Sequence, residues 1–498
     1  MPKITFTLDP QNRISQLDPR LFGSFIEHLG RAVYTGIYEP EHPQATKEGF
    51  RQDVIELVKE LGVTTVRYPG GNYVSGFNWR DGIGPQADRP VRLDYAWISK
   101  ETNQFGIDEF ARWCEKTGVE PMIAVNLGTG TPQEAGYFAE YCNHEGGTTL
   151  SDLRIQHGRK NPYNFRLWCL GNEMDGPWQT GQMNAREYAH KARETAKILR
   201  CVDPDVELVA CGSSSAQMTT FPEWDRVVLE ELYDYVDYIS CHQYYENEGS
   251  ETDFLASFVN MDNFIETIVS TANYAKALRR SDKNMMISFD EWNVWYLRGD
   301  PWDAPFKDKN NRFPVAPPLL EDKYSFLDAL VVGGLLCSLL NHADRVKMAS
   351  LAQLVNVIAP IFTEEGKGAI RQTIFWPFEM VASVARGCVL QHHLPVPTFS
   401  SKYGEARMVQ SAVIHNPEQK ELIIFALNCD FSQSWALDIN LAAFGRTRVR
   451  EHSVLRSDDL YAKNTFDQPE RVKPESIPHN GTIELPPLSW SRIIIAIE

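Results

Sequence analysis

The stretch Leu167-Trp168-Cys169-Leu170-Gly171-Asn172-Glu173 decides the fold of this chain. Four apolar residues, enough for a short buried strand, run directly into a glycine, an amide and a carboxylate. The stretch Ile287-Ser288-Phe289-Asp290-Glu291 has the same design farther along the chain. Buried strands that end in polar groups are typical of parallel sheets, in which the carboxyl ends of the strands meet at one edge.

Outward from these two stretches, short apolar runs alternate with longer amphipathic ones. Runs of the strand type are Leu21–Ile26, Thr64–Tyr68, Met122–Asn126, Leu167–Leu170, Leu208–Cys211, Tyr238–Cys241, Met285–Phe289 and Val346–Leu351. Helix-like runs between them include Gly49–Leu61, Ile107–Thr117, Asn184–Val202 and Tyr324–Asn341. Eight such repeats predict an α/β protein with a (β/α)8 TIM barrel over residues 18–387. A doubly wound open sheet is the structural alternative.

A second domain is expected because 498 residues exceed the ~250–300 at which one core usually stops growing. After about Cys388 the pattern changes to short alternating strands. These are Met408–Ile414, Leu422–Asn428, Trp435–Ile439, Thr447–Leu455, Ile483–Leu485 and Ser491–Ile497. They predict an antiparallel, jelly-roll-like β-sandwich over 388–498. The opening runs Ile4–Leu8 and Arg13–Leu17 have the same alternation, and we expect the sandwich to be structural rather than ligand-binding.

The amino-acid composition limits the kinds of molecule that the protein is expected to bind. A net charge of −17 argues against nucleic acid and anionic membranes, which would repel the protein, and is compatible with a neutral ligand. Nine scattered cysteines without a C-x-x-C pair indicate reduced thiols, and the chain opens without a signal-peptide pattern. These features predict a cytoplasmic protein. No glycine motif or histidine spacing suggests a cofactor or a metal, so none is expected.

Polar groups follow nearly every predicted strand, and two of them are paired carboxylates. Glycoside cleavage needs two carboxyl groups beside the anomeric carbon, one to donate a proton and one to attack or to activate water. Glu173 and Glu291 end the fourth and seventh strands and can point into one barrel mouth. Asp290 competes with Glu291, because strand alternation should let only one of the two face the axis. The residues alone leave that choice open.

Several motifs in order carry a resemblance that covers nearly the whole chain. They are Phe22-Gly-Ser-Phe-Ile-Glu27-His28, Arg67-Tyr-Pro-Gly-Gly-Asn72, Trp79-Arg-Asp-Gly-Ile-Gly-Pro85, Cys169-Leu-Gly-Asn-Glu173-Met-Asp-Gly-Pro-Trp178 and Asp290-Glu291-Trp-Asn-Val-Trp295. The chain resembles the α-L-arabinofuranosidases of glycoside hydrolase family 51, in the clan of retaining (β/α)8 glycosidases. The resemblance implies that residues 1–17 join the sandwich and that the protein forms a homo-oligomer, a hexamer.

The same resemblance implies roles for individual residues. Glu173 would be the acid/base and Glu291 the nucleophile, which decides against Asp290. Asn172 would bond the sugar 2-OH, Glu27 and Asn72 would contact other hydroxyls, and Arg67 and Tyr244 would orient the nucleophile. His242, Trp295 and Gln353 would complete the pocket, although the surroundings of Gln353 align less clearly.

The expected activity is release of terminal α-L-arabinofuranosyl residues from arabinan- or arabinoxylan-derived oligosaccharides by double displacement. One alternative is another retaining activity of the clan, an endo-β-glucanase or a β-xylosidase. Another is a non-catalytic sugar-binding protein, against which the retained carboxylates argue because buried charges are costly. The long segments Tyr73–Leu93 and Tyr296–Pro318 are expected to wall an exo-type pocket. Preference among α-1,2, α-1,3 and α-1,5 linkages stays open.

Overall fold

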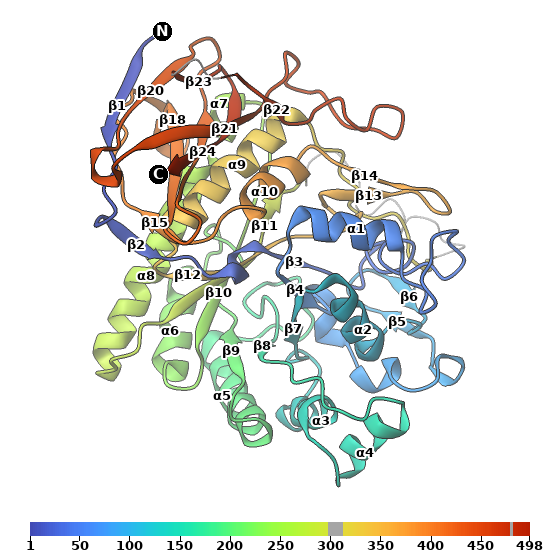
Figure 1. Cartoon of the computed structure of the whole chain (residues 1–498). Coiled ribbons are helices and arrows are strands. Elements are labelled where there is room, and N and C mark those ends of the chain that lie inside the picture. The colour runs from blue at the N-terminus through green and yellow to red at the C-terminus, as the bar shows by residue number, and fades with distance from the viewer. Residues whose placement is uncertain (297–311, 479–481) are drawn as a thin grey trace.

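The computed structural model describes residues 1–296, 312–478 and 482–498. Its centre is a closed barrel of parallel strands (Figure 1). In chain order these are β3 (Gly23–Phe25), β4 (Thr65–Tyr68), β7 (Glu120–Ala124), β8 (Leu167–Leu170), β9 (Glu207–Ala210), β10 (Tyr238–Tyr245), β11 (Met286–Val294) and β12 (Val346–Leu351). Because β12 pairs with β3 and closes the sheet, the predicted barrel is confirmed and the open sheet is excluded.

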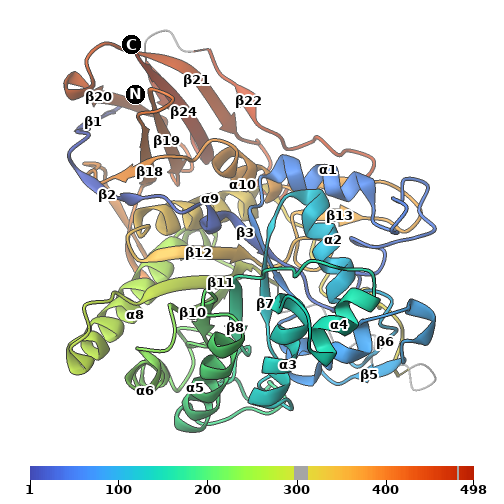
Figure 2. The same ribbon diagram turned by 60° about the horizontal axis from the view of Figure 1, so that its bottom comes forward.

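Helices surround the barrel, as Figure 2 shows. They are α1 (Gln52–Leu61), α2 (Ile107–Thr117), α3 (Pro132–Asn143), α4 (Thr149–Gln156), α5 (Ala185–Val202), α6 (Glu223–Leu232), α7 (Glu251–Leu255), α8 (Ser257–Arg279), α9 (Phe326–Asn341) and α10 (Phe375–Ala382). Local chemistry sets their ends: the side chain of Asn184 caps α5 and the αL residue Gly62 ends α1. Among the described residues, no helix combines the length and apolar character needed to cross a bilayer.

The helix α9 joins the barrel to the second domain. It is apolar on all sides and nearly all its residues are buried, because it packs between the barrel strand β11 and the sandwich strands β18 and β19. A Cβ atom on Gly333 would lie 2.6 Å from the indole of Trp490, so only glycine allows this close contact. One hydrophobic core therefore runs from the barrel into the sandwich.

Two sheets form the sandwich. One has the order β1-β20-β23 and the other β2-β15-β18-β19-β24-β21-β22. Their bounds are β1 (Lys3–Thr7), β2 (Arg13–Gln16), β15 (Cys388–Leu390), β18 (Val409–Asn416), β19 (Glu421–Asn428), β20 (Trp435–Asn440), β21 (Thr447–Leu455), β22 (Glu475–Ser476), β23 (Ile483–Leu485) and β24 (Ser489–Ile497). The two opening strands pair with β20 and β15. The β1–β20 pair is parallel, and the other pairings within the two sheets are antiparallel, as predicted for the sandwich.

Three small hairpins lie outside these layers: β5 (Arg92–Asp94) with β6 (Ser99–Glu101), β13 (Ile361–Thr363) with β14 (Ala369–Arg371), and β16 (Thr398–Ser401) with β17 (Gly404–Arg407). The predicted strand ends need correction in three places. β7 stops at Ala124, so Asn126 lies in the following turn and accepts a bond from the Thr129 amide. β10 and β11 continue several residues beyond their predicted ends, because parallel pairing between them extends to Tyr245 and Val294.

Candidate active site

Glu173 leaves β8 on a tight turn. Gly171 has a φ of 92° and Glu173 itself a φ of 43°, a left-handed conformation that is strained for a side-chain-bearing residue. The turn presents the carboxylate to two partners: Oε1 lies 2.8 Å from His242 Nδ1, and Oε2 accepts a 2.6 Å bond from Trp178 Nε1. A Cβ at Gly176 would lie 2.5 Å from the Trp178 ring, so the glycine admits the indole. Strained backbone held by specific contacts is common at functional sites.

Glu291 lies in β11 on the facing side of the mouth, and both of its oxygens are bonded. Arg67 Nη1 donates to Oε1 at 2.7 Å, and the hydroxyl of Tyr244 donates to Oε2 at 2.8 Å. The other terminal nitrogen of Arg67 donates to Asn172 Oδ1 at 2.5 Å. Charge-assisted bonds from a fully buried guanidinium stabilise the ionised carboxylate and fix its direction.

Asp290 shares its neighbours with Glu291. Its Oδ1 lies 2.8 Å from His242 Nε2 and its Oδ2 lies 3.8 Å from Arg67 Nε. The expectation that only one of the two acids could face the axis is therefore wrong. The pairing of β11 with β12 shifts register at this point, and such an irregularity breaks the strict alternation of side chains. Asp290 contacts the groups that hold the reacting carboxylates.

The imidazole of His242 bridges three acids. Burial disfavours its charged form, but the negative charge of Glu291 and the bonds to Asp290 and Glu173 outweigh burial and raise the pKa of His242 well above its usual value. This favours the doubly protonated ring, in which the two N–H groups face Glu173 and Asp290 as donors. Glu173, His242 and Glu291 offer atoms within 4.8 Å of one another, a spacing a metal ion could use. A doubly protonated imidazole has no lone pair for a metal ion. In that form, Glu173, His242 and Glu291 are arranged for proton transfer rather than for metal binding.

This spacing also bears on stereochemistry. One oxygen of Glu173 and one of Glu291 lie within 4.8 Å. Retaining glycosidases hold their carboxyl groups about 5–5.5 Å apart, whereas inverting enzymes need about 6.5–9.5 Å to admit a water molecule. A nearest oxygen pair this close agrees with the retaining arrangement.

Glu27 occupies the opposite part of the mouth, where β3 ends. The Tyr73 amide and Trp97 Nε1 both donate to Oε1 at 2.9 Å, and Gln353 Nε2 donates to Oε2 at 3.1 Å. A Cβ at Gly71 would lie 2.3 Å from Oε2, so the conformationally free glycine of this turn admits the carboxylate. The structure thus brings Gln353, the least clearly aligned of the predicted residues, against Glu27.

The electrostatics of Glu27 differ from those of Glu173 and Glu291. Burial raises its pKa to about 8 despite the bonds from Tyr73 and Trp97, and the charge of Glu291 adds to the rise. Within the described part of the chain, no cationic side chain bonds this carboxyl. Glu27 is therefore mainly protonated at neutral pH and can donate as well as accept a hydrogen bond.

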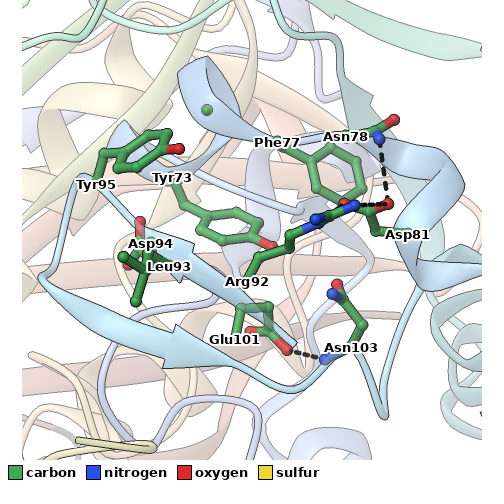
Figure 3. Close-up of a pocket in the computed structure, with 11 residues that line it drawn as sticks. Tyr73, Phe77, Asn78, Asp81, Arg92, Leu93, Asp94, Tyr95, Glu101 and Asn103 are labelled. Carbon is green, nitrogen blue, oxygen red and sulfur yellow. Dashed lines mark hydrogen bonds and ion pairs between the residues drawn. The ribbon is translucent and has the colours of Figure 1, made fainter. Parts of the chain in front are cut away.

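The hairpin β5–β6, which carries Trp97, is held in place behind Glu27. A small cavity of about 30 Å³ lies there, lined by groups that include Tyr73, Asp94 and Glu101 (Figure 3). Asp94 accepts from the Trp97 amide at 3.1 Å, and Glu101 lies 2.7 Å from His28 Nδ1. Room for about two water molecules is too little for a sugar. The cavity belongs to the support of the hairpin.

The remaining predicted residues also lie at this mouth. Asn72 begins a 3-10 turn directly after Gly71, with its side chain half-buried. Trp295 packs edge-on against Tyr244 with ring centroids 4.9 Å apart, and its buried Nε1 has no partner among the described residues. The predicted wall Tyr296–Pro318 lies mostly outside the described residues.

Two contacts were not predicted as part of the site. Trp97 belongs to a short polar hairpin with no motif around it, so no sequence signal could have found it. Trp178 ends the Glu173 motif, and that proximity was the available signal.

Comparison with known proteins places this geometry in a family. Residues 57–265 match the family described as "Alpha-L-arabinofuranosidase 1 domain", and residues 290–489 match "Alpha-L-arabinofuranosidase C-terminal domain". A solved family 51 α-L-arabinofuranosidase, AbfB from Bifidobacterium longum, superimposes with a TM-score of 0.93 at 43% identity, covering 99% of each chain. The chain belongs to family 51. Its members are retaining glycosidases, in accord with the carboxylate spacing.

Curated relatives of this family 51 chain differ in the linkage they are named for. An "Intracellular exo-alpha-(1->5)-L-arabinofuranosidase" from Streptomyces lividans is 52% identical over 98% of this chain and 74% of its own length. An "Exo-alpha-(1->6)-L-arabinofuranosidase" from Bifidobacterium longum is 49% identical over 98% of this chain and 96% of its own. Identity near 50% therefore does not fix the linkage.

Proposed function

We propose that this family 51 protein is an exo-acting retaining α-L-arabinofuranosidase. It removes terminal L-arabinofuranosyl residues from oligosaccharides derived from arabinan or arabinoxylan. The observation that carries the proposal is the pair Glu173 and Glu291, whose oxygens lie within 4.8 Å and whose partners differ. We propose the barrel as residues 18–387 and the sandwich as residues 388–498 with 1–17.

In the first half of the reaction, Glu291 is the nucleophile. Arg67 and Tyr244 leave it ionised and directed at the anomeric carbon. Glu173 donates its proton to the leaving oxygen as the bond to the sugar breaks, and a glycosyl–Glu291 ester forms.

In the second half, Glu173 acts as a base. The imidazolium of His242 and the indole of Trp178 stabilise the carboxylate that the first step leaves behind. This carboxylate removes a proton from water, which attacks the ester and releases arabinose with retained configuration. The hydrogen-bond donors on both oxygens of Glu173 therefore favour the carboxylate form, which the second half of the reaction uses.

Sugar binding is assigned to the groups around this pair. Asn172, oriented by Arg67, is assigned to the 2-OH. The neutral Glu27, with Gln353 and Asn72, contacts the other hydroxyls from the opposite side, and Tyr244 and the open Nε1 of Trp295 complete the wall. The protein is further proposed to be cytoplasmic, like the relatives named intracellular, and to form a homohexamer.

Rescue chemistry tests the assignment. The Glu173→Ala variant should hydrolyse a p-nitrophenyl arabinofuranoside far better than an unactivated oligosaccharide, because nitrophenolate leaves without a proton. Azide should restore activity on the aryl substrate and give an arabinosyl azide of retained configuration by NMR. Equal losses on both substrates without azide rescue would reject Glu173 as the acid. Preference of the wild-type enzyme for a β-glucoside or β-xyloside would favour the other activities of the clan.

A further inference from the structure

A second hollow lies on the rim of the barrel. One of its lining residues, Tyr296, directly follows Trp295 of the candidate active site in the sequence. Its volume is about 520 Å³, in the range of ligand-binding clefts. The barrel contributes Asn247 and Glu251, which follow β10, and Tyr296 and Asp322, which follow β11. Tyr296 is the chain neighbour of Trp295, whose ring packs against Tyr244 at the catalytic mouth. The hollow and the candidate active site therefore lie at the carboxyl ends of the same two strands, β10 and β11.

The second domain supplies the remaining side of the hollow. Between β21 and β22 the chain leaves the sandwich and runs over the barrel toward β13 and β14 (Figure 1). Backbone bonds anchor this arm, residues 456–474: the Phe326 amide donates to Ala462 at 2.8 Å and the Leu327 amide to Leu460 at 2.9 Å. Asn464 Nδ2 donates to the Arg371 carbonyl at 3.1 Å. The arm is thus fixed against the barrel.

Tyr461 lies on this arm, and its ring faces the hollow. Its neighbour Ala462 is buried, whereas the Tyr461 side chain is 54% exposed. Its hydroxyl donates to Glu251 of α7 at 2.5 Å, so one end of the ring is tied to the barrel while its faces stay accessible. A rigid exposed ring beside acidic groups and an amide matches a sugar, which has apolar C–H faces and many hydroxyls.

The charges around the hollow argue against other small ligands. The lining mixes four carboxylates with two ammonium groups, those of Lys323 and Lys463; the carboxylates are Glu251, Glu321, Asp322 and Asp328. The protein as a whole carries a net charge of −17, which repels polyanions. A neutral, hydroxyl-rich ligand pairs with both kinds of group without opposing a net charge.

We propose that this hollow is a distal subsite, which binds arabinosyl units of the substrate away from the bond being cleaved. The inference rests on the proposed function and adds to it that the sandwich domain recognises substrate through Tyr461. An exo-acting site holds one sugar deep in the mouth, so the rest of an oligosaccharide must lie along the rim. The hollow lies at the carboxyl ends of β10 and β11, and its lining residue Tyr296 directly follows Trp295 in the chain.

The test compares substrates of different length. For Tyr461→Ala, kcat/KM on p-nitrophenyl α-L-arabinofuranoside should stay within about twofold of wild type, while kcat/KM on linear arabinotetraose and arabinopentaose should fall about 3- to 10-fold, the loss of one aromatic contact. Tyr461→Phe keeps the ring and should retain the preference for longer chains. Tyr274→Ala is the matched control, because Tyr274 is 51% exposed on α8 outside the hollow.

The possible results separate the two proposals. Equal kcat/KM ratios for Tyr461→Ala and wild type at every chain length would overturn the subsite, as would an equal loss on the aryl substrate and the pentaose. Circular dichroism and melting curves establish that each variant is folded, and Tyr461→Leu, which keeps an apolar side chain but has no ring, replaces the alanine variant in the same comparison where that variant is unstable. Failure of the wild-type protein to cleave any arabinofuranoside would instead reject the proposed function.

Discussion

The two halves of the barrel mouth hold buried carboxylates in opposite ways. Around β8, β10 and β11, the acids Glu173, Asp290 and Glu291 are matched by Arg67 and the charged His242. Around β3 and the β5–β6 hairpin, Glu27 is bonded by neutral donors, and its pKa rises to about 8. The acids that would change charge during a double displacement have counter-charges, whereas Glu27, which would only bind hydroxyl groups, has none.

The largest expected effect comes from the charged half. Glu291→Gln keeps the shape of the side chain and removes the nucleophile, so kcat on the aryl arabinofuranoside should fall by roughly 10⁵-fold. Steady-state kinetics on protein purified free of wild-type enzyme measures the loss. Glu27→Gln is the matched control in the neutral half and should retain activity within about tenfold of wild type. Comparable losses in both variants would remove the distinction between the two halves.

A smaller effect is expected when the charged half is disturbed away from the reacting atoms. Asp290→Asn takes a negative charge from His242, so the pKa of the imidazole falls and the carboxylate form of Glu173 loses stabilisation. We expect kcat to fall about 10²-fold with little change in KM, and the alkaline limb of the pH profile to move to higher pH, because the proposed acid then keeps its proton to higher pH.

The control for this variant is Asp108→Asn. Asp108 is also a buried acid, bonded by Tyr141 and Tyr163 outside the mouth. Its loss should lower the melting temperature and leave the pH profile of kcat unchanged. An unshifted profile in Asp290→Asn would show that Asp290 acts only as a structural group.

The smallest effect is on stability and belongs to the neutral half. A carboxyl whose pKa rises from 4.5 to about 8 on folding stabilises the folded state fully below pH 4.5, and this contribution is lost as pH rises through about 8. Glu27→Gln cannot ionise. Its melting temperature, relative to wild type, should therefore increase steadily between pH 5 and pH 9. A difference that stays constant across this range would mean that Glu27 is already ionised at neutral pH.

The sequence pattern predicted much of the fold, because the residues of a short segment themselves indicate which of its side chains will be buried. Fully apolar runs with polar ends predicted the strands, and the hydrophobic period of α5 predicted that helix. The ends of β10 and β11 were missed because pairing between two strands decides how far each continues. The parallel partner of β1 lies more than 400 residues away, and nothing local to β1 encodes it.

The sequence by itself determined which chemistry the chain carries: two glutamates at strand ends, with an arginine, a histidine and amides in motifs that resemble one family. Only the tertiary structure decided how each acid is used. It brought Asp290 onto His242 through a register shift and placed Trp97 on Glu27. Residue identity fixes which groups can ionise, but the charges and donors brought near each group by folding set its protonation.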